Sequence, residues 1–136
     1  MRYTELCTAL ESALLSAGYT NSVYRGDVYD IWNNKEVQYV SACYDLIEAV
    51  YDDNLNQYNV RVYVADRLVE AETNETYALD ACEAVIRHAI ATLRAASGVL
   101  DIGCSSLVPF VQTFADNLAG YYADLQIQVI NKIDNC

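Results

Sequence analysis

The sequence predicts an α+β fold, in which a small, mainly antiparallel sheet of about four strands is flanked by two helices in the order α-β-β-β-α-β. Two segments carry apolar residues at helical spacing. Between them the period changes to two, and an alternating stretch from Leu125 to Val129 follows near the C-terminus. With 136 residues, 54% of them hydrophobic, and one proline, the chain is expected to form a single domain over residues 1–136.

The first predicted helix runs from Tyr3 to Ala17 and is followed by Gly18, a residue type that is common just after a helix end. Its apolar residues recur every three or four positions, at Leu6, Leu10, Ala13, Leu14 and Ala17. This spacing places them on one side of the helix, which we expect to be buried.

Three strands are predicted next, over Val23–Trp32, Val37–Val50 and Tyr58–Val64, where β-branched and aromatic residues are concentrated. Turn-forming residues separate them, which favours a meander. The end of the second strand, from Asp45 to Val50, is also compatible with a helical turn. In the third strand, three valines alternate with Arg61 and Tyr63, so one face should pack on helices and the other should meet water or a partner.

The second predicted helix follows Asn74, a candidate N-cap, and runs from Tyr77 to Ala96. Its apolar stripe consists of Ala78, Cys82, Val85, Ile86, Ala89, Ile90 and Leu93. Glu83 and Arg87 stand at the spacing of four that favours an ion pair. An alanine-rich side could receive another helix or lie in solvent.

After a loop over 98–106, one or two more strands are expected, although Phe114 and Leu118 could also belong to a short helical turn or an irregular connection. Leu125, Ile127 and Val129 are the expected buried side of the final strand. We expect that strand to be the last member of the sheet.

Charge narrows the possible functions. Nineteen acidic residues against eight basic ones give a net charge of −11, which disfavours binding to nucleic-acid phosphates and to anionic membranes. Solubility alone would explain most of the carboxylates. A conduit through which DNA passes without sticking would also be acidic. No apolar run is long enough to cross a bilayer, so we expect no membrane partner.

The sequence contains no recognisable catalytic motif. We therefore expect that the protein is not an enzyme and binds no cofactor. His88 has no neighbouring nucleophile or carboxylate pattern, and the five cysteines lack a zinc-type spacing. Asp27 with Asp30, or Asp52 with Asp53, could hold a magnesium ion, but solvated loop carboxylates explain both pairs better. The twelve tyrosines instead favour a sheet face covered by a partner, because tyrosine is enriched at protein interfaces.

One stretch has a more specific likeness. The segment Tyr58 to Val69, which includes Asp66-Arg67-Leu68, is followed by an acidic turn and a long helix. Near the C-terminus come Pro109-Phe110, Phe114-Ala115-Asp116 and Leu118-Ala119-Gly120, and then the alternating strand. In order and spacing these motifs resemble the tail-terminator and head-tail connector (neck ring) proteins of tailed bacteriophages. The resemblance covers about the last eighty residues.

The resemblance implies a structural virion protein of tail-terminator-like fold that forms a homo-oligomeric ring in the neck. Such a ring is assembled in the host cytoplasm, joins the portal or head to the tail tube or other neck proteins, and lets DNA pass through its lumen. It implies ring-to-ring contacts at the hairpin tip, made by Asp52, Asp53, Asn54, Leu55, Asn56 and Gln57. Contacts between subunits would involve Tyr39, Tyr58, Arg61, Tyr63, Asp66 and Arg67. Asp66 and Arg67 would form a local or inter-subunit ion pair.

Two other classes of function stay open at this point. The first is a small acidic phage-encoded inhibitor that mimics DNA, which would be a monomer or dimer with carboxylates spaced like phosphates. The second is a metal-dependent enzyme with clustered carboxylates.

Overall fold

The computed structural model describes residues 1–34, 36–51, 55–69, 74–104, 106–114 and 116–130. Within these ranges the chain forms three helices and six strands, in the order α1-β1-α2-β2-β3-α3-β4-β5-β6. The α+β class agrees with the prediction. The predicted arrangement is wrong, because the sheet is mixed and has six strands instead of four, and three helices accompany it instead of two.

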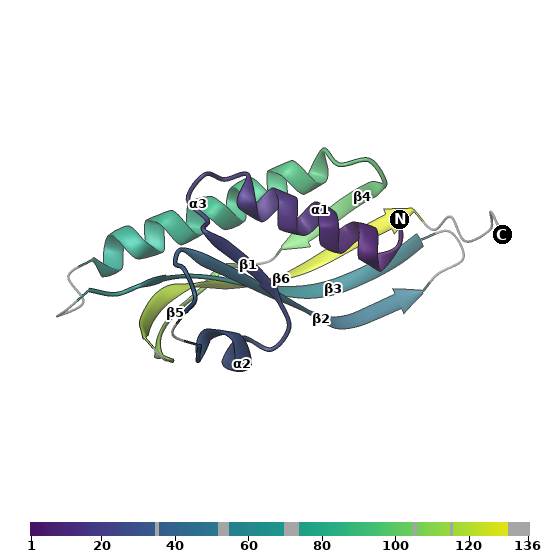
Figure 1. Ribbon diagram of the computed structural model, residues 1–136. Helices are drawn as coiled ribbons and strands as arrows, with labels where there is room; N and C mark the ends of the chain where they lie inside the picture. The colour runs from purple at the N-terminus through teal and green to yellow at the C-terminus, as the bar shows by residue number, and fades with distance from the viewer. Residues whose placement is uncertain (35, 52–54, 70–73, 105, 115, 131–136) are drawn as a thin grey trace.

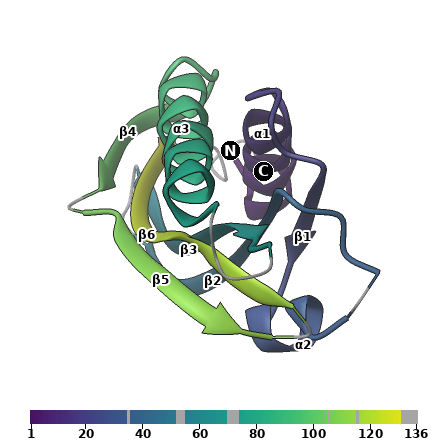
Figure 2. The same ribbon diagram turned by 90° about the vertical axis from the view of Figure 1, so that its left-hand side faces the viewer.

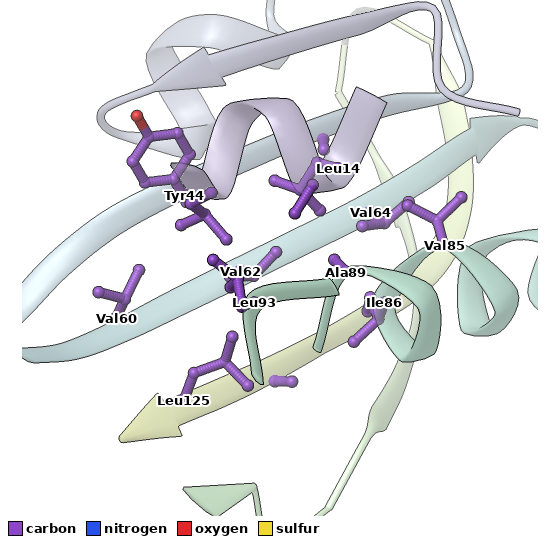
Figure 3. Close-up of a cluster of buried hydrophobic side chains, with 14 of the residues drawn as sticks. Leu14, Tyr44, Val60, Val62, Val64, Val85, Ile86, Ala89, Leu93 and Leu125 are labelled. Atoms are coloured by element: carbon purple, nitrogen blue, oxygen red, sulfur yellow. The ribbon is translucent and has the colours of Figure 1, made fainter. Parts of the chain in front are cut away.

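Two long helices cover one face of the sheet. They are α1 (Tyr3–Leu15) and α3 (Glu75–Arg94), and they lie side by side there (Figures 1 and 2). Both predicted helices therefore exist: the start of α1 is as predicted, and the other three ends differ by two residues. The side chains between helices and sheet form the main core, part of which Figure 3 shows, including Leu14, Tyr44, Val60, Val62, Val64, Val85, Ile86, Ala89, Leu93 and Leu125. The predicted stripes of the two helices supply much of this core.

The sheet has the strand order β1-β2-β3-β6-β4, with β5 also paired to β6. The two longest strands are β3 (Leu55–Arg67) and β6 (Asn117–Ile130), which pair along the whole of β3. On the other side of β6, β4 (Val99–Cys104) and β5 (Val108–Thr113) pair one after the other. The final strand of the chain is therefore an interior member of the sheet.

The first predicted strand, Val23–Trp32, is wrong in its second half. β1 covers Ser22–Arg25, and α2 then covers Val28–Trp32. Gly26 separates them with a φ of 132°, a conformation that favours glycine. Asp27 then caps the helix, because its Oδ1 accepts a hydrogen bond of 2.8 Å from the Tyr29 N–H. β1 pairs parallel to β2, so these strands do not form a meander.

The second predicted strand begins later than expected. β2 covers Ser41–Tyr51, and its end from Asp45 to Val50 is strand, not helical turn, although the register shifts between Leu46 and Glu48. The expected loop over 98–106 contains β4, whose edge-strand pairing with β6 overrides the local turn signals. At the start of α3 the Asn74 side chain bonds backward to the backbone of Arg67 and Val69 instead of capping the helix.

A second, smaller core lies on the opposite face of the sheet, where α2 is placed (Figures 1 and 2). Trp32 is at its centre, is fully buried, and donates a 3.1 Å hydrogen bond from Nε1 to Ser41 Oγ. Its neighbours include Cys43 and Ala65 of the sheet, Leu118 of β6 and Phe110 of β5. This cluster covers only one end of that face.

Candidate interaction surface

Among the residues that the structure describes, both sides of the sheet end in strands with an unpaired edge. β1 pairs with β2 from Ser41 to Tyr44, so within the described part of the chain the outer edge of β2 from Asp45 to Tyr51 has no neighbouring strand. On the far side, β4 and β5 each pair with β6 and with no other described strand. Unpaired backbone N–H and C=O groups on such edges can pair with another chain.

The β2 edge, residues Asp45 to Tyr51, carries exposed apolar side chains. Ile47 is 56% exposed, Val50 45% and Tyr51 67%. Two features restrict pairing at this edge: the acidic side chains of Asp45 and Glu48, and the irregular register between Leu46 and Glu48. Two acidic β2 edges would repel each other, which disfavours self-pairing.

The β5 edge, residues Val108 to Thr113, has a different character. It contains no charged residue, and Val111 is 49% exposed. Pro109 lacks the backbone N–H and therefore limits where a further strand can bond. The β2 and β5 edges are thus dissimilar, because the first is acidic and the second is uncharged. No repulsion between like charges opposes pairing of a β2 edge with a β5 edge.

The sheet face opposite α1 and α3 is polar where the Trp32 cluster does not cover it. Arg61 on β3 forms two hydrogen bonds with Asp124 on β6, from Nε to Oδ1 at 2.6 Å and from Nη2 to Oδ2 at 3.0 Å. Its guanidinium carbon also lies 4.9 Å from the centre of the Tyr122 ring. These bonds lower the pKa of Asp124 and raise the pKa of Arg61.

The tyrosines expected at a subunit interface have partners within the chain. Tyr63 is half-buried between Trp32, Phe110 and Tyr122, with ring centres 5.7–6.3 Å away. Tyr39 also packs near Trp32, and burial raises its pKa to about 12. Tyr58 lies on the helix-covered face.

There Tyr58 packs against Tyr3 of α1, at 5.4 Å between ring centres. The three tyrosines therefore do not form one surface, although each keeps some exposed area.

Asp66 and Arg67 adjoin at the end of β3. Asp66 Oδ1 accepts a 2.8 Å bond from the backbone N–H of Arg67. Their side chains form no ion pair with each other in the described structure, in which the pairs between side chains are Arg61–Asp124 and Glu83–Arg87. The predicted Glu83–Arg87 pair is thus confirmed, whereas the local form of the Asp66–Arg67 pair is not present.

Half of the predicted hairpin tip lies outside the described residues, namely Asp52, Asp53 and Asn54. Leu55, Asn56 and Gln57 are described and form the beginning of β3. All three are half-buried, and Leu55 pairs with Ile130 while Gln57 pairs with Gln128. The described part of this site is therefore a strand end inside the sheet.

The structure also places the residues considered for catalysis or metal binding. His88 on α3 is exposed and shares a 2.9 Å hydrogen bond with Ser16 Oγ. Asp27 is used as a helix cap, as described above. Among the described residues there is no group of three His, Cys, Asp or Glu side chains that could hold a metal ion. None of the helices in these ranges is long and apolar enough to span a membrane.

The sequence matches no known protein-family model and no curated protein.

Sequence reasoning missed the features that define this surface. The free β2 edge depends on β1 being short, and the signal for that was the Gly26-Asp27 step, which ends a strand and caps a helix. The Arg61–Asp124 pair joins residues far apart in the chain, so no local pattern indicates it.

Proposed function

We propose that this chain is a structural subunit of a tailed bacteriophage, and that copies of it assemble through their sheet edges into a ring at the head-tail junction. The observation that carries the proposal is the pair of dissimilar free edges on opposite sides of one sheet. The sequence resemblance supplies the place in the virion, with portal or tail-tube proteins as neighbours and DNA passing through the lumen.

Dissimilar edges favour a ring over a dimer. If the β2 edge of one copy pairs with the β5 edge of the next, each copy uses both edges, and the contact is head-to-tail. A head-to-tail contact closes into a ring when the rotation between neighbours allows it. The exposed Ile47, Val50 and Val111 would be covered in such a contact, and the acidic β2 edge would meet an uncharged strand.

The main test is assembly, measured by light scattering after size-exclusion chromatography and by negative-stain imaging. We expect rings at high concentration or after addition of the portal or tail-tube protein from the same phage. Ile47→Lys and Val111→Lys should each prevent ring formation, because each replaces an apolar side chain that the contact would cover with a charged one. Leu15→Lys is the matched control, since Leu15 is as exposed as Val111 but lies on α1.

Mixing the two edge variants makes the test sharper. A copy with Ile47→Lys keeps a normal β5 edge, and a copy with Val111→Lys keeps a normal β2 edge. The mixture should therefore form heterodimers and no rings. A wild-type chain that stays monomeric alone and with portal or tube protein would refute the proposal, and variants that form normal rings would refute the edge contact.

A further inference from the structure

A cavity of about 360 Å³ that is open to solvent lies between α3 and the residues Cys104, Ser106 and Leu107. It is lined by Arg87, Ile90, Ala91, Arg94, Cys104, Ser106 and Leu107. Four of its lining residues, Arg87, Ala91, Arg94 and Ser106, are exposed. Ile90, Ala91 and Arg94 follow Arg87 by three, four and seven positions, so the four residues share one side of α3. The volume falls within the range of small-molecule sites in proteins, about 300–1,000 Å³.

Positive charge is concentrated in this cavity, although the chain as a whole has a net charge of −11. Of the eight basic residues of the chain, two line the cavity. Arg87 is balanced by Glu83, which accepts bonds from its Nε and Nη2 at 3.1 and 3.0 Å. Arg94 donates from Nη2 to the Ile102 carbonyl oxygen at 3.2 Å, a neutral acceptor. Among the described residues, no carboxylate pairs with Arg94, so it is the better anchor for an anion.

We propose that this cavity binds a small organic carboxylate with a short apolar body. The guanidinium of Arg94 can bond a carboxylate with two parallel N–H groups. Ile90, Ala91 and Leu107 provide an apolar wall for the rest of the ligand. The negative charge of the whole protein repels anions at long range, which favours a single carboxylate over a multiply charged phosphate. The site does not depend on ring assembly.

Hexanoate is a suitable probe, with hexylamine as its positively charged counterpart. Cys104 lines the cavity and is half-buried, so its alkylation by iodoacetamide can report on occupancy at this position. We expect hexanoate to slow alkylation of Cys104 in a saturable manner, as followed by peptide mass spectrometry. Backbone amide NMR signals of Ile90 and Leu107 should shift with the same concentration dependence, and hexylamine should have neither effect.

Arg94→Gln should weaken hexanoate binding about threefold to fivefold, because Arg94 is exposed and solvent screens its attraction for the carboxylate. Arg94→Lys keeps the charge but loses the pair of parallel N–H groups, so its affinity should lie between those of wild type and Arg94→Gln. Arg61→Gln is the matched control, since Arg61 is on the opposite face of the sheet. Thermal unfolding of each variant checks that it is folded.

Four results would overturn the proposal. The first three are the absence of saturable binding at tens of millimolar hexanoate, equal affinity in wild type and Arg94→Gln, and equal protection of Cys104 by hexylamine. The fourth is binding of a blocked Ala-Glu-Leu-Glu-Ala peptide, but not hexanoate, with the same dependence on Arg94. That result would make the cavity a docking groove for an acidic protein segment.

Discussion

The hydroxyl of Tyr44 donates a 2.6 Å hydrogen bond to Glu11 Oε1, which connects the buried part of β2 to α1. Tyr44 is fully buried, and burial together with the bond to Glu11 raises the pKa of its hydroxyl far above the ordinary value. The bond therefore adds a specific polar contact to the apolar packing that holds α1 on the sheet.

Removing this hydroxyl should destabilise the protein measurably. We expect Tyr44→Phe to lower the free energy of unfolding by about 1.5–3 kcal/mol, the range for hydrogen bonds to charged groups. Urea denaturation checks the value. Glu11→Gln keeps an acceptor and should cost less. A Tyr44→Phe variant as stable as wild type would show that the bond contributes nothing.

The close approach of β3 and β6 at Gly120 predicts a strong effect of one methyl group. A Cβ at this position would overlap the backbone carbonyl of Val64 and come to 2.7 Å from Ala65 Cα. We therefore expect Gly120→Ala to cost about 3 kcal/mol or more. Gly103→Ala is the control, because its Cβ would meet the flexible Gln126 side chain at 3.2 Å. It should cost less than about 1 kcal/mol, and equal costs would contradict the interpretation.

Buried thiols predict a loss of stability at alkaline pH. Burial raises the pKa values of Cys43 and Cys82 from 9.0 to about 12. The folded state then binds the proton more tightly than the unfolded state, so this stabilisation is complete below pH 9 and declines as the pH rises toward 12. Urea denaturation between pH 8 and 11 under reducing conditions should show the decline. Cys82→Ala should reduce its slope, and an unchanged slope would exclude the thiol as a cause.

The Arg61–Asp124 pair should contribute little in spite of its geometry. Both side chains are substantially exposed, at 38% and 51%, so solvent screens their attraction. A double-mutant cycle with Arg61→Gln and Asp124→Asn should give a coupling of about 1 kcal/mol or less, lower still at high salt. Because the pKa of Asp124 is lowered, this coupling should disappear as the solution is acidified through that pKa. A coupling that persists there would contradict the assignment.

The sequence predicts well those elements whose pattern is local. The stripe from Ala78 to Leu93 and the alternation of Leu125, Ile127 and Val129 correspond to α3 and the buried side of β6. Each pattern reports directly which side chains are buried, and burial is what forms the element.

Elements that depend on distant partners were predicted poorly. β4 is a strand because its backbone pairs with β6, and the glycine-rich sequence around it reads as a loop. Tryptophan is a common residue type in strands, but Trp32 belongs to the short helix α2, which begins after Gly26 and the N-cap residue Asp27. The cavity beside Arg94 combines a helix with a strand connection, and the strand order that brings them together is not encoded in any one segment.

The position of β6 has a consequence for how the chain folds. Its partners β3, β4 and β5 all precede it, and β3 ends 50 residues earlier, at Arg67. During synthesis, the backbone N–H and C=O groups on one side of β3 therefore have no partner strand until the ribosome has produced β6. Such late pairing of distant strands makes folding slow and leaves an intermediate open to aggregation. We expect chaperone dependence to be greatest for nascent chains that end between β3 and β6.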